Sequence, residues 1–388
     1  MPTSPPSISD LDFIVAGATP TSRRLFLSRA SALGIALPSM GAALAACTRT
    51  EPRGGAGGAG TQRPERHEGE HGEEPEHAAH NPDSRLDTAL HHPRHPTSAV
   101  PGATAGAASV EYHRRDAELP PAAPGKVKRI HMTVRETPVR IRPDLVVAAW
   151  TFDGDVPGPV VHVRQGDTVE FTLTNEGVIP HSMDFHAAQI DPKIAFRSVP
   201  HGQSVSYTFR PKYAGAFLYH CGTSPVLMHL GSGMFGAIIV DPPKPLPPAK
   251  EFVLVQNEYY LTEPHDGVAA FSYAKALSLL PDVVCFNGRP TQYQDAPFVV
   301  KRGDRVRFYV VDAGPTHPCA FHVVGEQFDT VYLGAPPGNA FRGVQTFNVA
   351  AGGGMIFELV ADVAGDFPFV NHAFGHGQKG AIGVLRVE

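Results

Sequence analysis

The chain has 388 residues, a formal net charge of −5 at pH 7 and 42% apolar residues. This length can form two domains with buried cores. The negative charge, without a stripe rich in Lys or Arg, excludes nucleic acid as a partner. The 39 glycines and 38 prolines predict frequent turns and few long helices.

The first 47 residues are predicted to be an export signal. Arg23 and Arg24 precede a short apolar stretch rich in Ala and Gly, and residues 22–27 resemble a twin-arginine motif. The stretch is too short for a membrane span and fits a signal peptide. Because the segment ends in "LAAC", we expect Cys47 to carry a lipid; an ordinary signal with a chance cysteine is the alternative. Either signal predicts an exported protein, periplasmic or at the surface of a bacterium.

Residues 48–125 are predicted to be a disordered linker. The segment is rich in Gly, Glu, Pro and His and cannot bury enough apolar surface to offset the entropy of ordering. Seven histidines lie between His67 and His95. They could collect metal ions, but a solvated polar tether is the interpretation that we favour.

From about residue 126 the sequence changes to short runs of β-branched and aromatic residues, cut by Gly, Pro, Asp and Asn. Examples are "VRIRPDLVVAAWTFDG" and "QSVSYTFRPKYAGAFLYH". Such runs predict an all-β fold. Residues 267–280 are the best candidate for a short helix.

The second half of this region repeats the landmarks of the first in the same order. "FDG" (152–154) returns as "FNG" (286–288), and "VRQGDTVEFTLTN" returns as "VKRGDRVRFYVVD". We therefore expect two tandem Greek-key β-sandwiches, over residues 126–243 and 244–388. The Pro-rich residues 242–250 would join them.

One loop of the first copy carries a set of metal ligands. Seven residues separate Cys221 from His229, four separate His229 from Met234, and His181 lies on an earlier strand. A thiolate, two imidazoles and a thioether are the ligands of a blue-copper electron-transfer ion. Zinc is the rival for Cys and His ligands, and Met234 argues against it because a thioether is rarely a zinc ligand. For Cys221 alone, a buried structural thiol is the alternative.

The second copy has lost this ligand set. Aligning "HPCAFH" with "HSMDFH" and "GDFPFVNHA" with "GAFLYHC" places Ala373 opposite Cys221. The histidines retained there are His317, His322, His372 and His376.

Residues 125–388 resemble the copper-containing nitrite reductases, two-domain proteins of the cupredoxin family. The resemblance rests on "PHSMDFH", "YHCG" with "MHLGSGM", "AFHVVGEQFD" and "FVNH". It implies two copper ions per chain. The type 1 copper ligands would be His181, Cys221, His229 and Met234. The ligands of the catalytic type 2 copper would be His186, His220 and His372.

The resemblance also implies the reaction and the assembly. Nitrite would be reduced by one electron to nitric oxide and water, with a cupredoxin or a cytochrome c as the electron donor. Adjacent Cα atoms lie about 3.8 Å apart, so His220 and Cys221 would form the electron route between the coppers. The family is a homotrimer, and His372 of one subunit would complete the type 2 site of its neighbour.

Nitrite reduction also needs two protons for each electron. By resemblance, Asp184 bonds the copper-bound ligand and relays protons. His322 would be the second proton-handling residue, oriented by Thr346. Val324 corresponds to an apolar residue, isoleucine in many members of the family, that crowds the open coordination position. For His317 we expect only a structural hydrogen bond.

Two other functions are alternatives on the residues alone. A laccase-type multicopper oxidase needs four His-x-His pairs, and the chain has none. A lipid-anchored electron carrier or copper-binding protein, with only the first site filled, is harder to exclude. Copper content discriminates between them, with two ions per chain for the reductase and one for the carrier.

Two cysteines remain outside these sites. Cys285 and Cys319 could form a disulfide in an exported protein. Both lie in predicted strands, so buried free thiols are an equal alternative.

Overall fold

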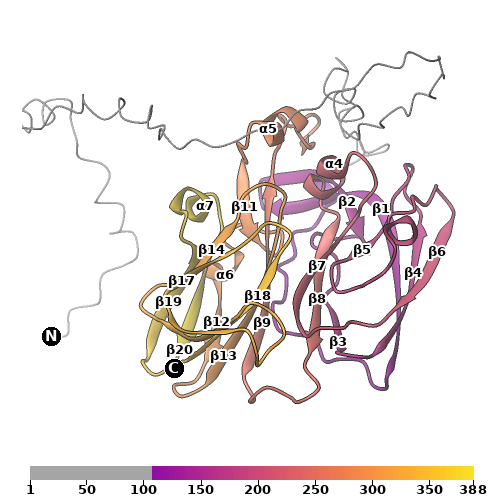
Figure 1. Cartoon of the computed structure of the whole chain (residues 1–388). Coiled ribbons are helices and arrows are strands. Elements are labelled where there is room, and N and C mark those ends of the chain that lie inside the picture. Colours follow the sequence, from indigo (N-terminus) through magenta and orange to yellow (C-terminus); the bar gives the residue numbers. More distant parts are fainter. Residues whose placement is uncertain (1–106) are drawn as a thin grey trace, which may run out of the picture. The chain divides into compact units, whose positions relative to one another are not determined.

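The computed structural model describes residues 107–388 (Figure 1). The predicted export signal, Cys47 and the histidines from His67 to His95 lie outside the described residues. No helix within residues 107–388 has the length and apolar character needed to cross a membrane.

The first copy folds into a sandwich of two sheets. Its strands are β1 (Val127–Arg142), β2 (Leu145–Phe152), β3 (Val161–Arg164), β4 (Thr168–Asn175), β5 (Asp184–Phe185), β6 (Ser204–Phe209), β7 (Gly215–His220), β8 (Phe235–Asp241) and β10 (Val268–Ala269). The five-stranded sheet has the order β10-β2-β1-β4-β6, and the four-stranded sheet has the order β3-β8-β7-β5. In β4, "TVEFTLTN", every second side chain is buried, as expected for a strand with one face on a core. Strand β10 belongs to the second predicted domain by sequence, yet it completes the first sheet.

The second copy folds into a second, larger sandwich. Its strands are β9 (Lys250–Tyr259), β11 (Val283–Phe286), β12 (Ala296–Val300), β13 (Arg305–Gly314), β14 (Cys319–Val323), β15 (Phe328–Tyr332), β16 (Ala340–Val344), β17 (Thr346–Val349), β18 (Gly354–Val360), β19 (Gly365–Asn371) and β20 (Ile382–Val387). The sheet orders are β11-β9-β13-β18-β15-β16 and β12-β20-β19-β14-β17. Their shared core is rich in phenylalanine. The two sandwiches confirm the predicted all-β class.

Short helices lie only in the connections of the described chain. They are η2 (Ala107–Ser109), α3 (Pro192–Ala195), α4 (Val226–Gly231), α5 (Tyr273–Leu277), α6 (Gln292–Asp295) and α7 (Phe374–Gln378). The helix predicted over residues 267–280 is reduced to α5. The helix is shorter than predicted because the residues before it form β10 and its flanking loop. It begins after Ser272, whose side chain accepts the N–H of Lys275 and caps the helix.

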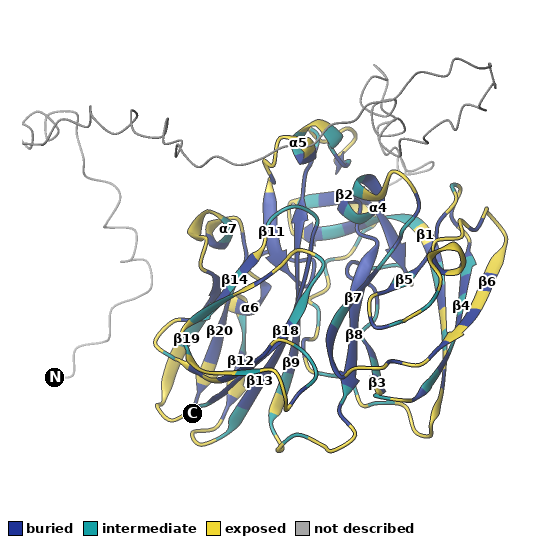
Figure 2. Cartoon of the chain, viewed as in Figure 1, coloured by how far each residue is buried: buried dark blue, intermediate teal, exposed yellow. Residues whose placement is uncertain are grey.

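The two sandwiches pack through the smaller sheet of the first and the six-stranded sheet of the second. A Cβ added at Gly354 on β18 would lie 2.3 Å from the carbonyl oxygen of Ala216 on β7, so only glycine permits this approach. The strands here are buried, dark blue in Figure 2. The apolar residues between the sheets include Ala216, Leu218, Ala237, Ile239, Val253, Val255, Val311 and Ile356. Both faces of β7 are therefore covered.

Backbone conformation shows which segments of the two copies are equivalent. Gly215 and Gly365, the first residues of β7 and β19, have φ values of 148° and 152°. Gly233 and Gly380, shortly before β8 and β20, have φ values of 116° and 120°. Because side chains other than glycine avoid such values, the pair β7–β8 corresponds to the pair β19–β20.

This register makes Asn371, rather than Ala373, the equivalent of Cys221. The N–H of Cys221 donates to the carbonyl of Met234 at 3.1 Å, and the N–H of Asn371 donates to the carbonyl of Ala381 at 3.0 Å. The alignment that placed Ala373 opposite Cys221 is therefore wrong by two residues. It matched the histidines of "YHC" and "NHA", although the loop after the strand is shorter in the second copy.

Part of the predicted linker is ordered along the second sandwich. Ala117 is buried in the core of that sandwich, and Glu118 forms a β-bridge with Phe252. Order therefore begins before residue 125, where the linker was expected to end. The sequence did not predict this order, because the segment is polar and its partner strand β9 lies far away in the sequence.

The repeated turns "FDGD" and "FNGR" contact each other through opposite charges. Asp155 and Arg289 hold the same place in the two turns, because each forms an isolated bridge with the phenylalanine three residues before it. Arg289 Nη2 lies 2.6 Å from Asp155 Oδ1, and Arg115 Nη1 lies 2.7 Å from Oδ2. The Arg289 side chain is only 3% exposed. One carboxylate thus joins both sandwiches and the N-terminal segment.

Replacing this carboxylate should destabilise the described fold. Asp155→Asn leaves the buried guanidinium of Arg289 without its counter-charge, which costs about 3 kcal/mol of unfolding free energy. Denaturant unfolding measures the change. Asp366→Asn is the control, because its pair with Arg386 is exposed and should change the midpoint little. Equal midpoints for the two variants would contradict the role of Asp155.

Candidate metal centres

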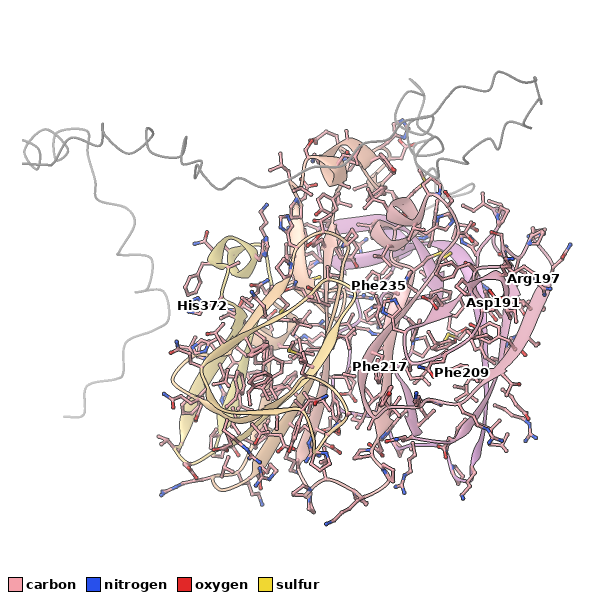
Figure 3. The ribbon with its side chains drawn as sticks, in the orientation of Figure 1. Asp191, Arg197, Phe209, Phe217, Phe235 and His372 are labelled. Atoms are coloured by element: carbon pink, nitrogen blue, oxygen red, sulfur yellow. The ribbon has the colours of Figure 1, made fainter. Side chains whose placement is uncertain are left out.

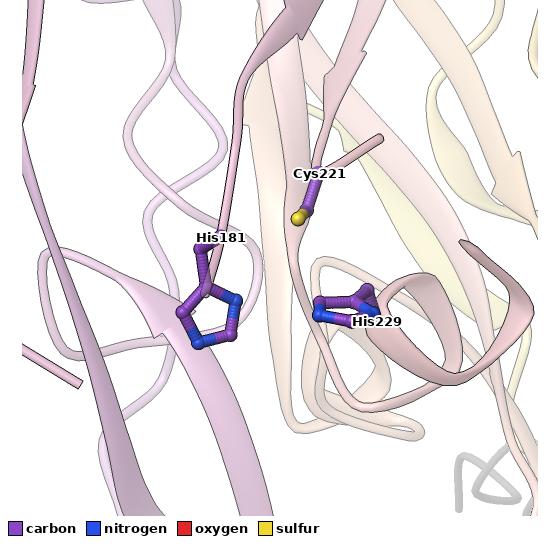
Figure 4. A group of neighbouring side chains, drawn as sticks. All are labelled: His181, Cys221 and His229. Carbon is purple, nitrogen blue, oxygen red and sulfur yellow. The ribbon is translucent and has the colours of Figure 1, made fainter. Parts of the chain in front are cut away.

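His181, Cys221 and His229 meet inside the first sandwich (Figure 4). Cys221 follows the last residue of β7, His229 lies in α4, and His181 lies shortly before β5. Their ligand atoms, one from each residue, all lie within 4.8 Å of one another, and all three residues are buried. The structure thus brings together three ligands that the sequence predicts for the first centre.

The hydrogen bonds of the two imidazoles leave one nitrogen of each ring without a partner. His181 Nε2 donates to Glu136 Oε1 at 3.1 Å, and His229 Nδ1 donates to the carbonyl of Pro225 at 3.0 Å. Nδ1 of His181 and Nε2 of His229 are buried and have no hydrogen-bond partner. Because buried polar atoms are normally satisfied, these two lone pairs fit a metal ion beside the sulfur.

The surroundings of Cys221 favour the thiolate form. Burial opposes ionisation, but the neighbouring His181 and the N–H groups of Ser182 and Thr223 hold the pKa of the thiol below its ordinary value. The N–H of Ser182 lies 3.3 Å from Sγ. Met234 is fully buried, and its backbone is hydrogen-bonded to Cys221. Thiolate, imidazole and thioether groups together favour copper over zinc.

Two residues at this centre were missed by the sequence analysis. The ring of Trp150 packs edge-on against both imidazoles, with centroid distances of 5.7 Å to His181 and 4.8 Å to His229. Glu136 precedes His181 by 45 residues, and its side chain is 5% exposed. Trp150 is the single tryptophan of the chain, which was the only signal available. Nothing in the strand "VRETPVRIR" distinguishes the glutamate.

Asp184, His186 and His220 form a second group on the same sandwich. Asp184 and His220 are cross-strand neighbours on β5 and β7. Asp184 Oδ2 lies 3.6 Å from His186 Nε2 and 3.8 Å from His220 Nε2. This group is more open than the first, since the side chain of His186 is 33% exposed. A small anion could therefore reach it.

Both imidazoles of the second group direct a lone pair at one point. His186 Nδ1 donates to the carbonyl of Gly352 and His220 Nδ1 to the carbonyl of Cys221, each at 2.9 Å. The two Nε2 atoms then face each other at 3.1 Å. Two nitrogens bound to one tetrahedral metal ion are about 3.3 Å apart. Burial and the neighbouring His186 hold the pKa of His220 below its ordinary value, which favours the neutral ligand.

The other residues predicted for the second centre lie on the second sandwich. His322 is on β14, His372 follows β19, and their ring centroids are 5.2 Å apart. His322 Nδ1 donates to the carbonyl of Gln345 at 2.6 Å, so this carbonyl, and not the hydroxyl of its cross-strand neighbour Thr346, holds the ring. Val324 is 40% exposed. Together these side chains form a half-site open to solvent.

His372 does not join His186 and His220 within one chain. Among the described residues, the group of ligand atoms within 4.8 Å of one another contains Asp184, His186 and His220. Figure 3 shows His372 on the second sandwich, well apart from Phe235, the cross-strand neighbour of His220. One chain therefore carries the two halves of the predicted second centre on different sandwiches.

The two half-sites occupy equivalent positions in the two copies. Asp184 pairs with His220 between β5 and β7, and His322 pairs with Val370 between β14 and β19. His220 and Val370 are each the sixth residue of their strand, so Asp184 and His322 are equivalent. The alignment of "HSMDFH" with "HPCAFH" is thus two residues out of register.

The remaining histidine and thiols have structural surroundings. His317 Nε2 donates to the carbonyl of Leu279 at 3.0 Å, the structural hydrogen bond expected for it. Cys285 and Cys319 are both buried and free, so they do not form the disulfide considered above. Burial raises the pKa of both thiols, which keeps them protonated and unreactive.

The known proteins that this chain resembles are copper proteins. A family model described as multicopper oxidase matches residues 133–245, within which the first sandwich carries its metal ligands. The copper-containing nitrite reductase of Neisseria meningitidis serogroup A is 39% identical over 285 residues, which cover 70% of this chain and 73% of that protein. The protein of the same name from Cereibacter sphaeroides is 30% identical over 305 residues, covering 69% and 78%.

Solved structures with this fold include reductases and oxidases. A copper nitrite reductase from Nitrosomonas europaea is 36% identical with a TM-score of 0.62, covering 67% of this chain and 94% of that one. A copper-containing nitrite reductase from Thermus scotoductus is 28% identical with a TM-score of 0.62, covering 68% and 62%. The multicopper oxidase mgLAC is 26% identical with a TM-score of 0.58, covering 68% and 86%.

Replacing Cys221 should abolish the thiolate signature of the first centre. Cys221→Ser removes the sulfur that gives a copper(II)–thiolate site its intense visible absorption, which spectroscopy of copper-loaded protein measures. Cys285→Ser is the matched control, since this buried thiol lies outside both ligand groups. Visible absorption that survives in Cys221→Ser would contradict the assignment.

Proposed function

Because this chain belongs to the copper-containing nitrite reductases, we propose that it reduces nitrite to nitric oxide and water. The balanced reaction consumes one electron and two protons: NO₂⁻ + e⁻ + 2H⁺ → NO + H₂O. One observation carries the proposal. His220 and Cys221 are adjacent in the chain, and each belongs to a different group of converging ligand atoms.

Two copper ions per chain are proposed. His181, Cys221, His229 and Met234 would hold the type 1 copper. The type 2 copper would be held by His186 and His220 with His372 of the partner subunit. Bound copper would supply one-electron transfer at the first group and an electron-accepting site for nitrite at the second. The buried, unpartnered nitrogens of His181 and His229 support the first assignment, and the facing Nε2 atoms support the second.

The electron would pass from Cys221 to His220 through the peptide unit that joins them. The hydrogen bond from His220 Nδ1 to the carbonyl of Cys221 adds a second contact between these two residues, at 2.9 Å. No other residue is needed to connect the two groups. The covalent geometry of the peptide unit fixes the length of this connection.

Asp184 and His322 would handle the two protons. The carboxyl of Asp184 can hold a proton beside the nitrite and give it to the oxygen that leaves as water. The side chain of Asp184 is 21% exposed, which supports exchange of protons with solvent. His322 would supply the second proton from the facing half-site, held by the carbonyl of Gln345. Val324 beside it would limit how nitrite sits.

We infer a homotrimer with the type 2 centre between subunits. Within one chain the half-site of His186 and the half-site of His372 lie on different sandwiches. A heterologous contact between them closes into a ring under cyclic symmetry, and the family gives three as the number of subunits. The equivalence of Asp184 and His322 supports this contact. The first sandwich of one subunit and the second sandwich of its neighbour would meet through equivalent faces.

The remaining proposals concern location and partners. The twin-arginine motif and Cys47 support export and attachment to a bacterial membrane through a lipid. A cupredoxin or a cytochrome c would then deliver the electron outside the cytoplasm. The rival oxidase requires a three-copper cluster held by His-x-His pairs, one of which encloses a cysteine. The sequence has no His-x-His pair, and Gly222 follows Cys221.

Nitrite turnover tests the reductase against the electron carrier. Protein with its copper counted should produce nitric oxide from nitrite and an artificial reductant at about two copper ions per chain. Asp184→Asn should lower kcat by roughly 100-fold, since it removes a proton-transfer group, while Asp266→Asn, an exposed acid, should not. A protein with a thiolate band that reduces no nitrite would be an electron carrier.

A mixing experiment tests the shared type 2 centre. His186→Ala and His372→Ala chains should each be inactive alone. Random mixing of refolded subunits should restore about a quarter of wild-type turnover, because one interface in four combines two intact halves. Mixing His186→Ala with His220→Ala is the control and should restore none, since both lesions lie in the same half. No recovery in the first mixture would mean a centre within one chain.

A further inference from the structure

Glu136 is a buried carboxylate at the first metal centre that the proposed mechanism does not use. It lies on β1 with its side chain 5% exposed. Its Oε2 accepts the N–H of Val178 at 2.9 Å, and its Oε1 lies 3.4 Å from the N–H of Ile179. Oε1 also accepts Nε2–H of His181 at 3.1 Å. The carboxylate thus holds both a loop and a metal ligand.

The second copy contains the equivalent carboxylate, Glu258. Glu136 lies opposite Trp150, two residues before the phenylalanine of the first repeated turn. Glu258 lies opposite Val284, two residues before the phenylalanine of the second turn. The loop contacts are also equivalent, because Glu258 accepts the consecutive N–H groups of Thr316 at 3.1 Å and His317 at 2.7 Å.

The two carboxylates differ in their remaining partner. In the first copy this partner is the imidazole of His181. In the second copy Glu258 Oε2 instead accepts the hydroxyls of Tyr260 at 2.6 Å and Thr316 at 2.8 Å. Cys319 stands at the position equivalent to His181. Holding the loop is therefore common to both copies, whereas contact with a ligand occurs only in the copy that carries the first metal group.

We propose that Glu136 is a positioning residue of the first metal centre, which fixes the ring of His181 and adds a negative charge behind it. As a pure acceptor, the carboxylate requires the proton of His181 on Nε2, which leaves the lone pair of Nδ1 free beside the sulfur of Cys221. Such carboxylate partners raise the basicity of a ligating imidazole. This inference rests on the proposed type 1 copper.

The charge has a consequence that a purely structural residue would not have. A negative charge behind the imidazole stabilises copper(II) more than copper(I), because the oxidised ion carries the larger positive charge. Removing the charge should therefore weaken copper(II) binding more than copper(I) binding and raise the reduction potential. A residue that only holds the loop would change the affinities for both ions equally.

Glu136→Gln, with Glu258→Gln as the matched control, tests the inference. Affinities of the full-length chain are measured by chelator competition. The thiolate absorption band reports copper(II) binding, and the absorption of a coloured copper(I) chelator reports copper(I) binding, because the copper(I) site has no thiolate band. We expect Glu136→Gln to lose about 10–100-fold in copper(II) affinity, with a smaller loss for copper(I). Glu258→Gln should keep both affinities, although both variants lose a buried carboxylate that holds a loop.

The outcomes separate this inference from the proposed function. Wild-type protein without a thiolate band would contradict the type 1 copper itself. A wild-type band with an unchanged ratio of copper(II) to copper(I) affinity in Glu136→Gln would overturn only the role of Glu136. If Glu136→Gln does not fold, Glu136→Asp replaces it, since it keeps the charge but moves it away from Nε2. Lower copper(II) affinity in that variant supports the inference, and unchanged affinity overturns it.

Discussion

His220 and Cys221 leave the end of β7 toward opposite sides, because successive side chains of an extended chain alternate. Cys221 enters the buried interior of the first sandwich, and His220 enters the partly exposed second group. This division needs a strand that cannot slip, since a shift of one residue would exchange the two sides. β7 meets that need because the core of its own sandwich covers one face and the second sandwich covers the other.

The two copies carry different side-chain interactions at equivalent backbone positions. Asp155 and Arg289 occupy one such position and have acquired opposite charges, so the two copies attract each other. Glu136 and Glu258 have kept their chemistry at another. In each case the backbone contacts are the same in both copies, and either the side chain or its partner differs. Equivalent strand pairing in the two copies therefore carries different side-chain interactions.

The sequence predicted what is local and missed what depends on strand pairing. Alternating apolar residues gave the all-β class, and Cys221, His229 and Met234 were recognised because one short loop carries them. The predicted alignment of the two copies was wrong by two residues, because it matched histidines that are not equivalent. The glycines with positive φ at the strand ends show the correct alignment and the shorter loop of the second copy. Glu136 could not be found, because its role arises only when β1 lies beside a loop 45 residues away.

The second copy shows how the equivalent loop is held without the set of metal ligands. Asn371 Oδ1 accepts the N–H of Ala320 at 3.2 Å, as Cys221 Sγ accepts the N–H of Ser182. Its Nδ2 lies 3.2 Å from Nδ1 of His376. The amide therefore serves the backbone as the sulfur does and offers the imidazole a proton where the first copy presents free lone pairs. Buried polar groups are normally partnered. The second copy holds its loop with hydrogen bonds, whereas the buried unpartnered nitrogens of His181 and His229 in the first copy fit a cation.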